Sequence, residues 1–120
     1  MDKDCIFCKI IRREIPANIF FENEEFLAFD MIEPVANRHT ILIPKKHSTN
    51  LFDIEKETLE KLSGLAKQIA SDLVKKHRAS GVNLLHAAGK DAQQSVFHFH
   101  MHIVPRYEND NLDPWFRNKL

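Results

Sequence analysis

The sequence lacks a net charge, because 17 lysine and arginine residues balance 17 aspartate and glutamate residues among its 120 positions. Such a chain has no overall field that would hold nucleic acid or an anionic membrane nonspecifically. No uninterrupted apolar run approaches the roughly 18 residues of a membrane-spanning helix. The first residues, MDKDCIFCKI, also lack the apolar core of a secretory signal. These absences predict a cytoplasmic protein with neither nucleic-acid nor membrane partners.

Linkers rich in glycine or serine, low-complexity tracts and internal repeats are absent as well. We therefore expect one domain over residues 1–107 and a polar tail over residues 108–120. The tail carries an apolar pair, Trp115 and Phe116, that could cover a substrate entrance or reach a partner subunit. A domain of this length buries roughly two-thirds of the surface of its unfolded chain, so a core forms without disulfide bonds.

Cysteine is scarce, and the only two, Cys5 and Cys8, lie in the N-terminal segment CIFC. Thiols of a cytoplasmic protein stay reduced, so this spacing favours half of a metal site over a structural disulfide. Free thiols and a redox-active dithiol remain the alternatives.

The apolar patterns predict an α+β domain. KIIRREIP is typical of a short helix that ends before Pro16, NIFFE and EFLAFD predict a hairpin, and HTILIP predicts a buried strand. From Asp53, the expected N-cap, to about Arg78, apolar residues recur at three- and four-residue spacing, which predicts a long amphipathic helix. Gly81 follows as a stop signal, and VNLLH and VFHFHMHIV predict two more strands. We expect a five-stranded, largely antiparallel sheet covered on one face, with one long and one short helix.

The segment QSVFHFHMHIVP places His98, His100 and His102 at alternate positions of a predicted strand. Alternate side chains face the same way, so the imidazoles share one face while the apolar residues from Phe97 to Ile103 face the core. Neighbouring histidines lie about 6.6 Å apart, so they can serve one ligand or two abutting sites. A solvated polar face is the alternative, but lysine, threonine or glutamate would serve solvation equally well. Imidazole binds metals and can act as a nucleophile near neutral pH, which favours chemistry.

Together with CIFCKIIRREIP, FLAFD and HTILIPKKH, this segment resembles the histidine triad (HIT) family of nucleotide hydrolases and transferases. The resemblance covers roughly residues 5 to 107 and is closest to the small single-domain phosphoramidase-like branch with an N-terminal zinc-binding cysteine pair. It implies the HIT-like fold and a homodimer whose two five-stranded sheets join into one. It also implies a nucleotide phosphoramidase or nucleotidyl hydrolase that acts at the α-phosphate of a purine nucleotide or nucleotide conjugate.

The resemblance implies the catalytic roles as well. His100 would attack phosphorus and carry the nucleotide, which splits one hard displacement into two easier ones. His102 would donate a hydrogen bond to a phosphate oxygen. Ser95 and the backbone N–H groups of residues 89–94 would supply further donors, with Ser95 also assisting the leaving group. His39 would orient the nucleophile.

The nucleoside would lie among apolar residues and its phosphate at the loop before the triad. The implied substrate-binding residues are Phe7, Ile10, Ile15, Phe29, Asp30, Gly89, Gln93, Gln94, Ser95 and His102. The apolar members can stack on a purine, and each would also suit an ordinary core.

The resemblance completes the metal site. Bacterial relatives with the cysteine pair bind zinc with two further histidines, here His47 and His98, so the implied structural Zn²⁺ ligands are Cys5, Cys8, His47 and His98. Such a site would pin the N-terminal segment against the sheet without joining the chemistry. A catalytic ion on all three triad histidines is disfavoured, because their row spans about 13 Å and zinc–nitrogen bonds measure about 2.0–2.1 Å.

Three positions depart from the family pattern. Met31 stands where relatives usually have an aspartate that holds the ribose, and Asp30 lies one residue early, which reverses side-chain direction in an extended segment. Ala87 stands where many relatives have asparagine, and Gln93 replaces a glycine that lets the backbone approach phosphate. Base preference and natural substrate therefore stay open. Dinucleoside polyphosphate hydrolysis, or a zinc-bearing nucleotide-binding protein with little catalysis, are the alternative functions.

Overall fold

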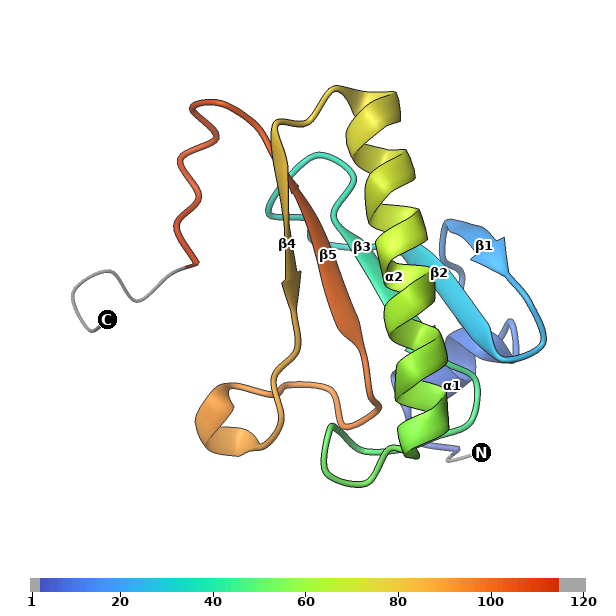
Figure 1. Ribbon diagram of the computed structural model, residues 1–120. Coiled ribbons are helices and arrows are strands. Elements are labelled where there is room, and N and C mark those ends of the chain that lie inside the picture. Colours follow the sequence, from blue (N-terminus) through green and yellow to red (C-terminus); the bar gives the residue numbers. More distant parts are fainter. Residues whose placement is uncertain (1–2, 115–120) are drawn as a thin grey trace.

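The computed structural model describes residues 3–114, which form a five-stranded antiparallel sheet and two helices (Figure 1). The strands are β1 (Ile19–Glu22), β2 (Phe26–Asp30), β3 (Thr40–Pro44), β4 (Gly81–Leu85) and β5 (Met101–Arg106), in the spatial order β1-β2-β3-β5-β4. The helices are α1 (Ile6–Ile11) and α2 (Lys56–His77), and a short 3-10 helix, η1 (Lys90–Ala92), follows β4. The predicted α+β fold is confirmed. Neither α1 nor α2 is long and apolar enough to cross a membrane.

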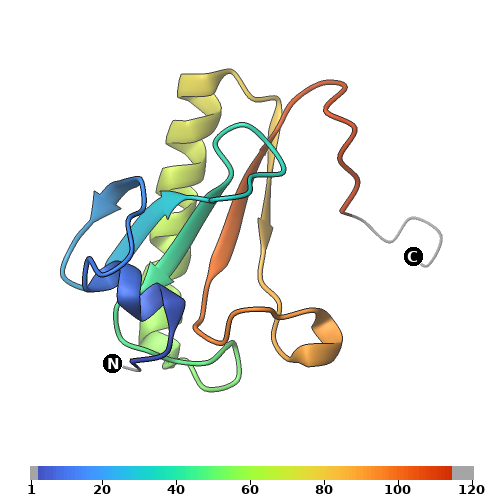
Figure 2. The same cartoon turned by 180° about the vertical axis from the view of Figure 1, so that it is seen from behind.

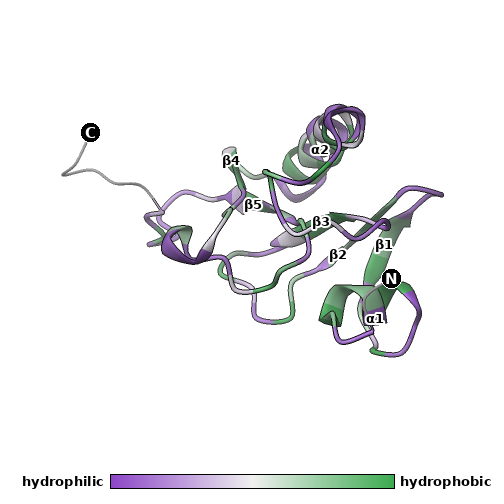
Figure 3. Ribbon diagram, turned by 90° about the horizontal axis from the view of Figure 1, so that it is seen from below, coloured by the Kyte–Doolittle hydropathy of each residue, from purple (hydrophilic) through white to green (hydrophobic). Residues whose placement is uncertain are grey.

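The helices cover opposite faces of the sheet, whereas one covered face was predicted (Figure 3). Central strands β2 and β3 are buried on both faces, because alternate side chains enter two separate clusters. Ala28 and Leu42 pack with α2, and their neighbours Leu27 and Ile41 pack with the α1 side. Figure 2 shows α1 on the face that α2 leaves open.

Helix α2 matches the predicted apolar periodicity but not the predicted ends. Its N-cap is Glu55 rather than Asp53, whose carboxylate instead accepts two N–H groups of the preceding turn at 2.8 Å. The helix ends at His77, and its C-cap Arg78 takes a left-handed conformation with φ of 56°. Gly81 is therefore not the stop signal but the first residue of β4.

Helix α1 lies earlier in the chain than predicted. Its N-cap is Cys5, whose Sγ accepts the N–H of Cys8 at 3.3 Å. The chain leaves the helix after Ile11 and turns at Arg13, where φ is 65°. The helix is thus over well before Pro16, and its N-terminal cysteine pair lies beside His47 and His98.

Strand β5 begins five residues later than the predicted strand, whose first residue was Val96, because residues 96–98 form a bend. The Phe99 N–H donates to the carbonyl of Ser48 at 2.7 Å, so this stretch joins the loop after β3 and not a strand ladder. Phe97, expected in the core, is 50% exposed. Phe99 and Ile103 are buried as predicted.

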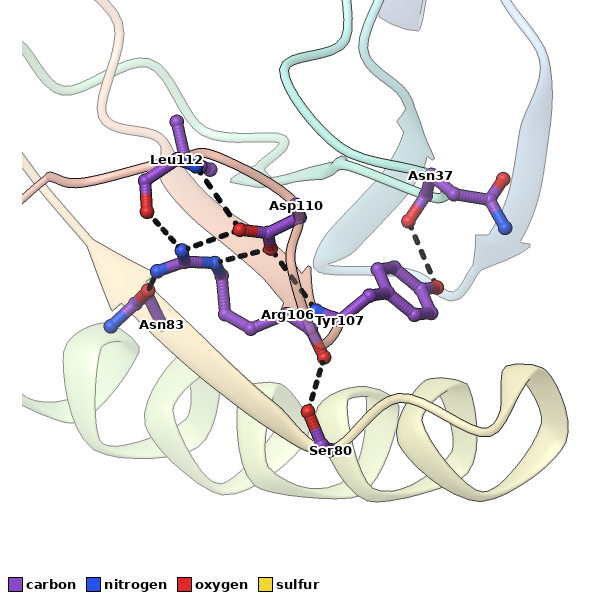
Figure 4. Close-up of polar contacts among 7 residues, drawn as sticks. All are labelled: Asn37, Ser80, Asn83, Arg106, Tyr107, Asp110 and Leu112. Carbon is purple, nitrogen blue, oxygen red and sulfur yellow. Dashed lines mark hydrogen bonds and ion pairs between the residues drawn. The ribbon is translucent and has the colours of Figure 1, made fainter.

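Beyond β5 the chain folds back onto the Arg106 guanidinium (Figure 4). Arg106 donates to both carboxylate oxygens of Asp110 at 2.9 Å and to the carbonyl of Leu112. The hydrogen bond from Arg106 holds the pKa of Asp110 well below its usual range. The folded contacts thus extend to Leu112, five residues past the predicted boundary at residue 107. Trp115 and Phe116 lie outside the described residues.

Candidate active site and metal cluster

The triad imidazoles divide between two adjacent sites. The His100 and His102 rings lie together, with centroids 5.0 Å apart. The His98 ring faces the cysteine pair, with Nδ1 3.3 Å from Cys5 Sγ and 3.5 Å from Cys8 Sγ. Because residues 96–98 form a bend, the His98 ring does not follow the alternation of an extended chain and points away from the other two.

His100 is held in one neutral tautomer. Its Nδ1 lies 2.8 Å from the His98 carbonyl oxygen, and since a carbonyl only accepts, Nδ1 carries the proton and Nε2 keeps its lone pair. The residue is 6% exposed, and burial lowers its pKa, which favours the neutral ring. Such an imidazole can attack an electrophile through Nε2 without prior deprotonation.

His102 is oriented by His39. The Val35 N–H donates to His39 Nδ1 at 3.3 Å, so His39 donates through Nε2 to His102 Nδ1 at 2.9 Å. His102 therefore carries its own proton on Nε2, as a donor toward a ligand. Burial lowers the pKa of His102 to about 4 and also lowers that of His39. His39 was expected to orient the nucleophile, but it contacts the neighbouring ring.

His86, which no sequence motif marks, braces the same segment. Its Nε2 accepts the Leu51 N–H at 3.0 Å, and its Nδ1–H donates to the His100 carbonyl at 3.0 Å. The ring also stacks on Phe99 with centroids 4.2 Å apart. A lone histidine at the end of a predicted strand offers no signal for this role, because its partners are distant in sequence.

The loop of residues 89–94 is held from inside. The buried Gln94 side chain accepts the Gly89 N–H at 2.8 Å and donates to the carbonyls of Thr49 and Val96. The N–H groups of residues 92, 93 and 94 bind carbonyl oxygens of the loop itself. Four of the six N–H groups expected to bind phosphate, and the Gln94 side chain, thus maintain the shape of the loop.

Gln93 and Ser95 flank that buried glutamine. Gln93 has φ of 70°, a left-handed conformation that costs an ordinary residue about 1–2 kcal/mol and glycine far less. Glycine suits this position because of the backbone conformation itself, and not only because of an approach to phosphate. Ser95 is exposed, and its hydroxyl makes no hydrogen bond within residues 3–114. It is therefore accessible to a ligand.

The four apolar residues expected around the base lie mostly in the core. Ile10 and Phe29 are 1% and 2% exposed and offer no surface for stacking, while Ile15 packs half-buried at the rim of the same cluster. Phe7 packs edge-on against the His100 ring, with centroids 5.1 Å apart. Phe7 thus forms a wall of the nucleophile's site.

A cavity of about 310 Å³ opens beside His39 and is lined by Met31, Asp30 and Arg38 among others. The Asp30 carboxylate accepts from Asn18 and pairs with Arg38 at 3.3 Å. Asp30 is therefore engaged within the protein, and Met31 lines the cavity beside it. Ala87 is half-buried in the segment after β4.

Four ligand-type side chains converge at the N-cap of α1. The ligating atoms of Cys5, Cys8, His47 and His98 all lie within 4.8 Å of one another. His47 Nδ1 lies 3.1 Å from His98 Nδ1 and 3.5 Å from Cys8 Sγ. His98 donates through Nε2 to the Pro44 carbonyl at 2.8 Å, which leaves Nδ1 as the ligand atom. Burial lowers the pKa of His98 to about 4, which keeps that nitrogen unprotonated.

The donor set and its spacing suit a tetrahedral ion. Bonds of about 2.0–2.3 Å separate the ligands of a tetrahedral zinc ion by about 3.3 to 3.8 Å; four of the ligand pairs here lie 3.1 to 3.5 Å apart, and all ligand atoms lie within 4.8 Å of one another. Two thiols and two imidazoles with no room for substrate are typical of a closed structural site. The predicted cluster is therefore able to hold a metal ion.

The family model of the HIT domain matches residues 12–109, which include the nucleophile candidate, its neighbours and two of the four cluster residues. The chain belongs to the HIT family. An uncharacterised HIT-like protein of Borreliella burgdorferi is 39% identical to this HIT protein over 119 residues, which are 98% of this chain and 86% of that one.

Two further relatives bear on chemistry. Adenosine 5′-monophosphoramidase HNT1 of Saccharomyces cerevisiae is 40% identical over 106 residues, 88% of this chain and 65% of the yeast protein. The crystal structure of a Zn-bound histidine triad family protein from Mycobacterium smegmatis matches with a TM-score of 0.86 and 37% identity, over 91% of this chain and 79% of that one. This HIT protein thus has a named phosphoramidase and a zinc-bound protein among its relatives.

Proposed function

We propose that this HIT protein is a nucleoside phosphoramidase that hydrolyses a P–N bond through a nucleotidyl group on His100 Nε2. The observation that carries the proposal is the bond from His100 Nδ1–H to the His98 carbonyl, because it leaves the Nε2 lone pair for attack. The activity of the yeast relative, an adenosine 5′-monophosphoramidase, supports the substrate class.

In the first step the Nε2 lone pair forms a bond to the α-phosphorus while the P–N bond to the leaving amine breaks. The amine takes up a proton from solvent, for which the exposed Ser95 hydroxyl is a relay. The imidazole then carries a positive charge, which the His98 carbonyl stabilises through Nδ1–H. In the second step water attacks phosphorus, the P–Nε2 bond breaks, and water's proton passes to solvent. Nucleoside monophosphate leaves and neutral His100 returns.

His102 stabilises the phosphoryl group in both steps. Its Nε2–H is a donor for a phosphate oxygen whose charge is held during the displacement. His39 keeps the His102 ring in the tautomer that presents this donor. Because both rings are neutral near pH 7, the site supplies hydrogen bonds rather than fixed positive charge.

The test is a comparison of His100→Ala with His77→Ala, a histidine substitution at the end of α2. Rapid acid quench with a labelled nucleoside phosphoramidate should trap label on the natural protein and on His77→Ala. His100→Ala should lose turnover by a factor on the order of 10³ or more and still bind nucleoside monophosphate. Near-normal turnover of His100→Ala would refute the assignment.

The same assay distinguishes the alternative functions. A panel of nucleoside phosphoramidates and dinucleoside polyphosphates should show faster turnover of the phosphoramidates. Faster turnover of the dinucleotides would instead assign a dinucleoside polyphosphate hydrolase. Binding without any trapped intermediate would indicate a nucleotide-binding protein.

The cavity lined by Met31 is the proposed nucleoside pocket, so Met31→Asp should change the affinity for ribose-containing ligands relative to deoxyribose ones.

We also propose a structural Zn²⁺ on the four-residue cluster, supported by the zinc-bound mycobacterial relative. When bound, this ion joins α1 to the loop after β3 and takes no part in bond cleavage. Elemental analysis of protein purified without chelator should find one zinc per chain. Its absence would contradict the assignment.

A homodimer is proposed at the free edge of β4. This strand ends the sheet, and its Val82 and Leu84 side chains are 36% and 45% exposed beside an apolar groove of about 340 Å³ against α2. An unpaired edge with apolar side chains favours pairing with a second strand. Light scattering should give twice the chain mass, and Leu84→Lys should reduce it to that of one chain.

A further inference from the structure

His98 belongs to both the metal cluster and the nucleophile's site. Its Nδ1 lies among the thiols and His47 at 3.1 to 3.5 Å. Its backbone carbonyl accepts the Nδ1–H of His100 at 2.8 Å. A displacement of the His98 ring would therefore move the one acceptor that determines the tautomer of the nucleophile.

The backbone at His98 is not held by a strand ladder. It lies in the bend of residues 96–98, and pairing with β3 and β4 begins only at Met101 and His102. Its own side chain is held by the Nε2–H bond to the Pro44 carbonyl, by the Phe7 ring and by the cluster, while the neighbouring Val96 carbonyl and Phe99 N–H bond to Gln94 and Ser48. With an ion bound, the Nδ1 side is fixed by a coordinate bond, which is shorter and stiffer than the hydrogen-bond-length contacts between the ligands.

A second connection runs through α1. The ring of Phe7, adjacent in sequence to Cys8, lies edge-on to both His98 and His100, with centroids 5.9 and 5.1 Å away. A six-residue helix is marginal by itself, so its position depends on what ties it to the sheet. Cys5 and Cys8 place two of the four cluster ligands at this helix, and the ion would fix Phe7 against the nucleophile.

We propose that metal occupancy of the Cys5–Cys8–His47–His98 cluster sets the position and tautomer of the His100 ring, with His98 and Phe7 as positioning residues. This inference rests on the proposed nucleophilic role of His100. Loss of the ion should leave nucleotide binding largely intact and slow the formation of nucleotidyl-His100. Removing a group that orients a functional residue from outside its direct contacts lowers activity about 10- to 100-fold. We therefore expect the rate of nucleotidyl-His100 formation to fall by a factor of that order.

Cys5→Ser and His47→Gln test the proposal. The serine keeps the N-cap of α1 and removes the thiolate, so it separates metal binding from helix capping. His47→Gln removes a ligand that makes no contact with His100 within residues 3–114. His77→Gln is the matched control. Readouts are zinc content, nucleoside monophosphate affinity, the rate of acid-stable labelling of His100, and histidine ¹⁵N chemical shifts, which distinguish a protonated from an unprotonated ring nitrogen.

Both ligand variants should lose zinc and label His100 more slowly, with little change in nucleotide affinity. Their His100 ¹⁵N signals should move from the pattern of a ring protonated only on Nδ1 toward the average of the two neutral tautomers. The natural protein depleted of zinc gives the same comparison without a substitution, and reloading it with Cd²⁺, which again engages all four ligands, should restore the His100 signals of the zinc form. His100 signals that are identical in the zinc, cadmium and zinc-depleted proteins would overturn the inference. The ¹⁵N signals need no turnover, so a failed phosphoramidase assay leaves this test decisive.

Discussion

The two faces of the sheet differ in what their buried residues can do. Under α2, a helix of 22 residues covers a cluster of ten buried apolar residues. On the other face the six-residue helix α1 places two of its own apolar side chains against four of the sheet, and the histidines lie beside them. The face under the long helix α2 contributes to stability alone. The face under the short helix α1 holds imidazoles that are buried enough to stay neutral and close enough to solvent to contact a ligand.

Leu62→Ala should produce the largest effect on the α2 face. Leu62 is 0% exposed, so the change removes buried methyl groups and leaves a cavity that costs about 3 kcal/mol in the free energy of unfolding. Urea unfolding measures the loss. Turnover per folded molecule should stay unchanged, and a large fall in turnover would show that the two faces are not separate.

His39→Phe should produce the reverse pattern on the histidine face. Phenylalanine retains the ring but not the donor to His102, so turnover should fall about 5- to 10-fold, the equivalent of one neutral hydrogen bond of about 1 to 1.4 kcal/mol. His77→Phe on α2 is the control. Steady-state kinetics at saturating substrate provide the measurement, and an unaltered rate would remove His39 from the site.

The pH dependence of the free energy of unfolding should also distinguish the histidine face from the α2 face. Burial lowers the pKa of His102 from 6.5 to about 4. Between these values the unfolded chain binds a proton there that the folded chain does not, so stability is constant above about pH 6.5 and falls as the pH drops toward 4. Urea midpoints at pH 7.5, 6 and 5 should show this fall, with zinc content checked at each pH. His102→Asn should flatten the slope, and an equally steep slope in that variant would contradict the assignment.

Gly64→Ala should produce the smallest effect. Gly64 lies on the exposed side of α2, and an added Cβ meets nothing within 4 Å. Alanine should stabilise the helix by about 1 kcal/mol. The thermal midpoint should rise with no change in turnover, whereas a lower midpoint would reveal a contact of α2 that residues 3–114 do not include.

Much of the architecture could be predicted because it is local. The periodicity of α2 and the alternation of Phe99, His100, Met101 and His102 follow from helix and strand repeats that are visible within a few residues. Element ends were harder. Asp53 and Gly81 are typical boundary residues, but Asp53 closes the turn before the helix and Arg78 takes the left-handed position. Several residues near a helix end can act as its cap, and the surrounding tertiary contacts determine which of them does.

The candidate site also has parts that could be predicted from the sequence and parts that could not. The family resemblance grouped the four metal-cluster residues, and the structure brings their ligand atoms within 4.8 Å of one another. The roles of His39, His86 and Gln94 depend on partners 63, 35 and 45 residues away, respectively, and no local pattern encodes such pairs. Ile10 and Phe29 have the composition of a base pocket and the burial of a core, a distinction that only packing makes.

By itself, the sequence determined the α+β fold, the long helix, the histidine-bearing segment and the membership of the HIT family, because all of these are repeats or motifs of contiguous residues. Only the tertiary structure decided that the His98 carbonyl holds His100, and that His39 contacts His102. The tautomer and ionisation of an imidazole depend on which acceptor and how much water surround it, and those neighbours come from strands and loops that meet only in the folded chain.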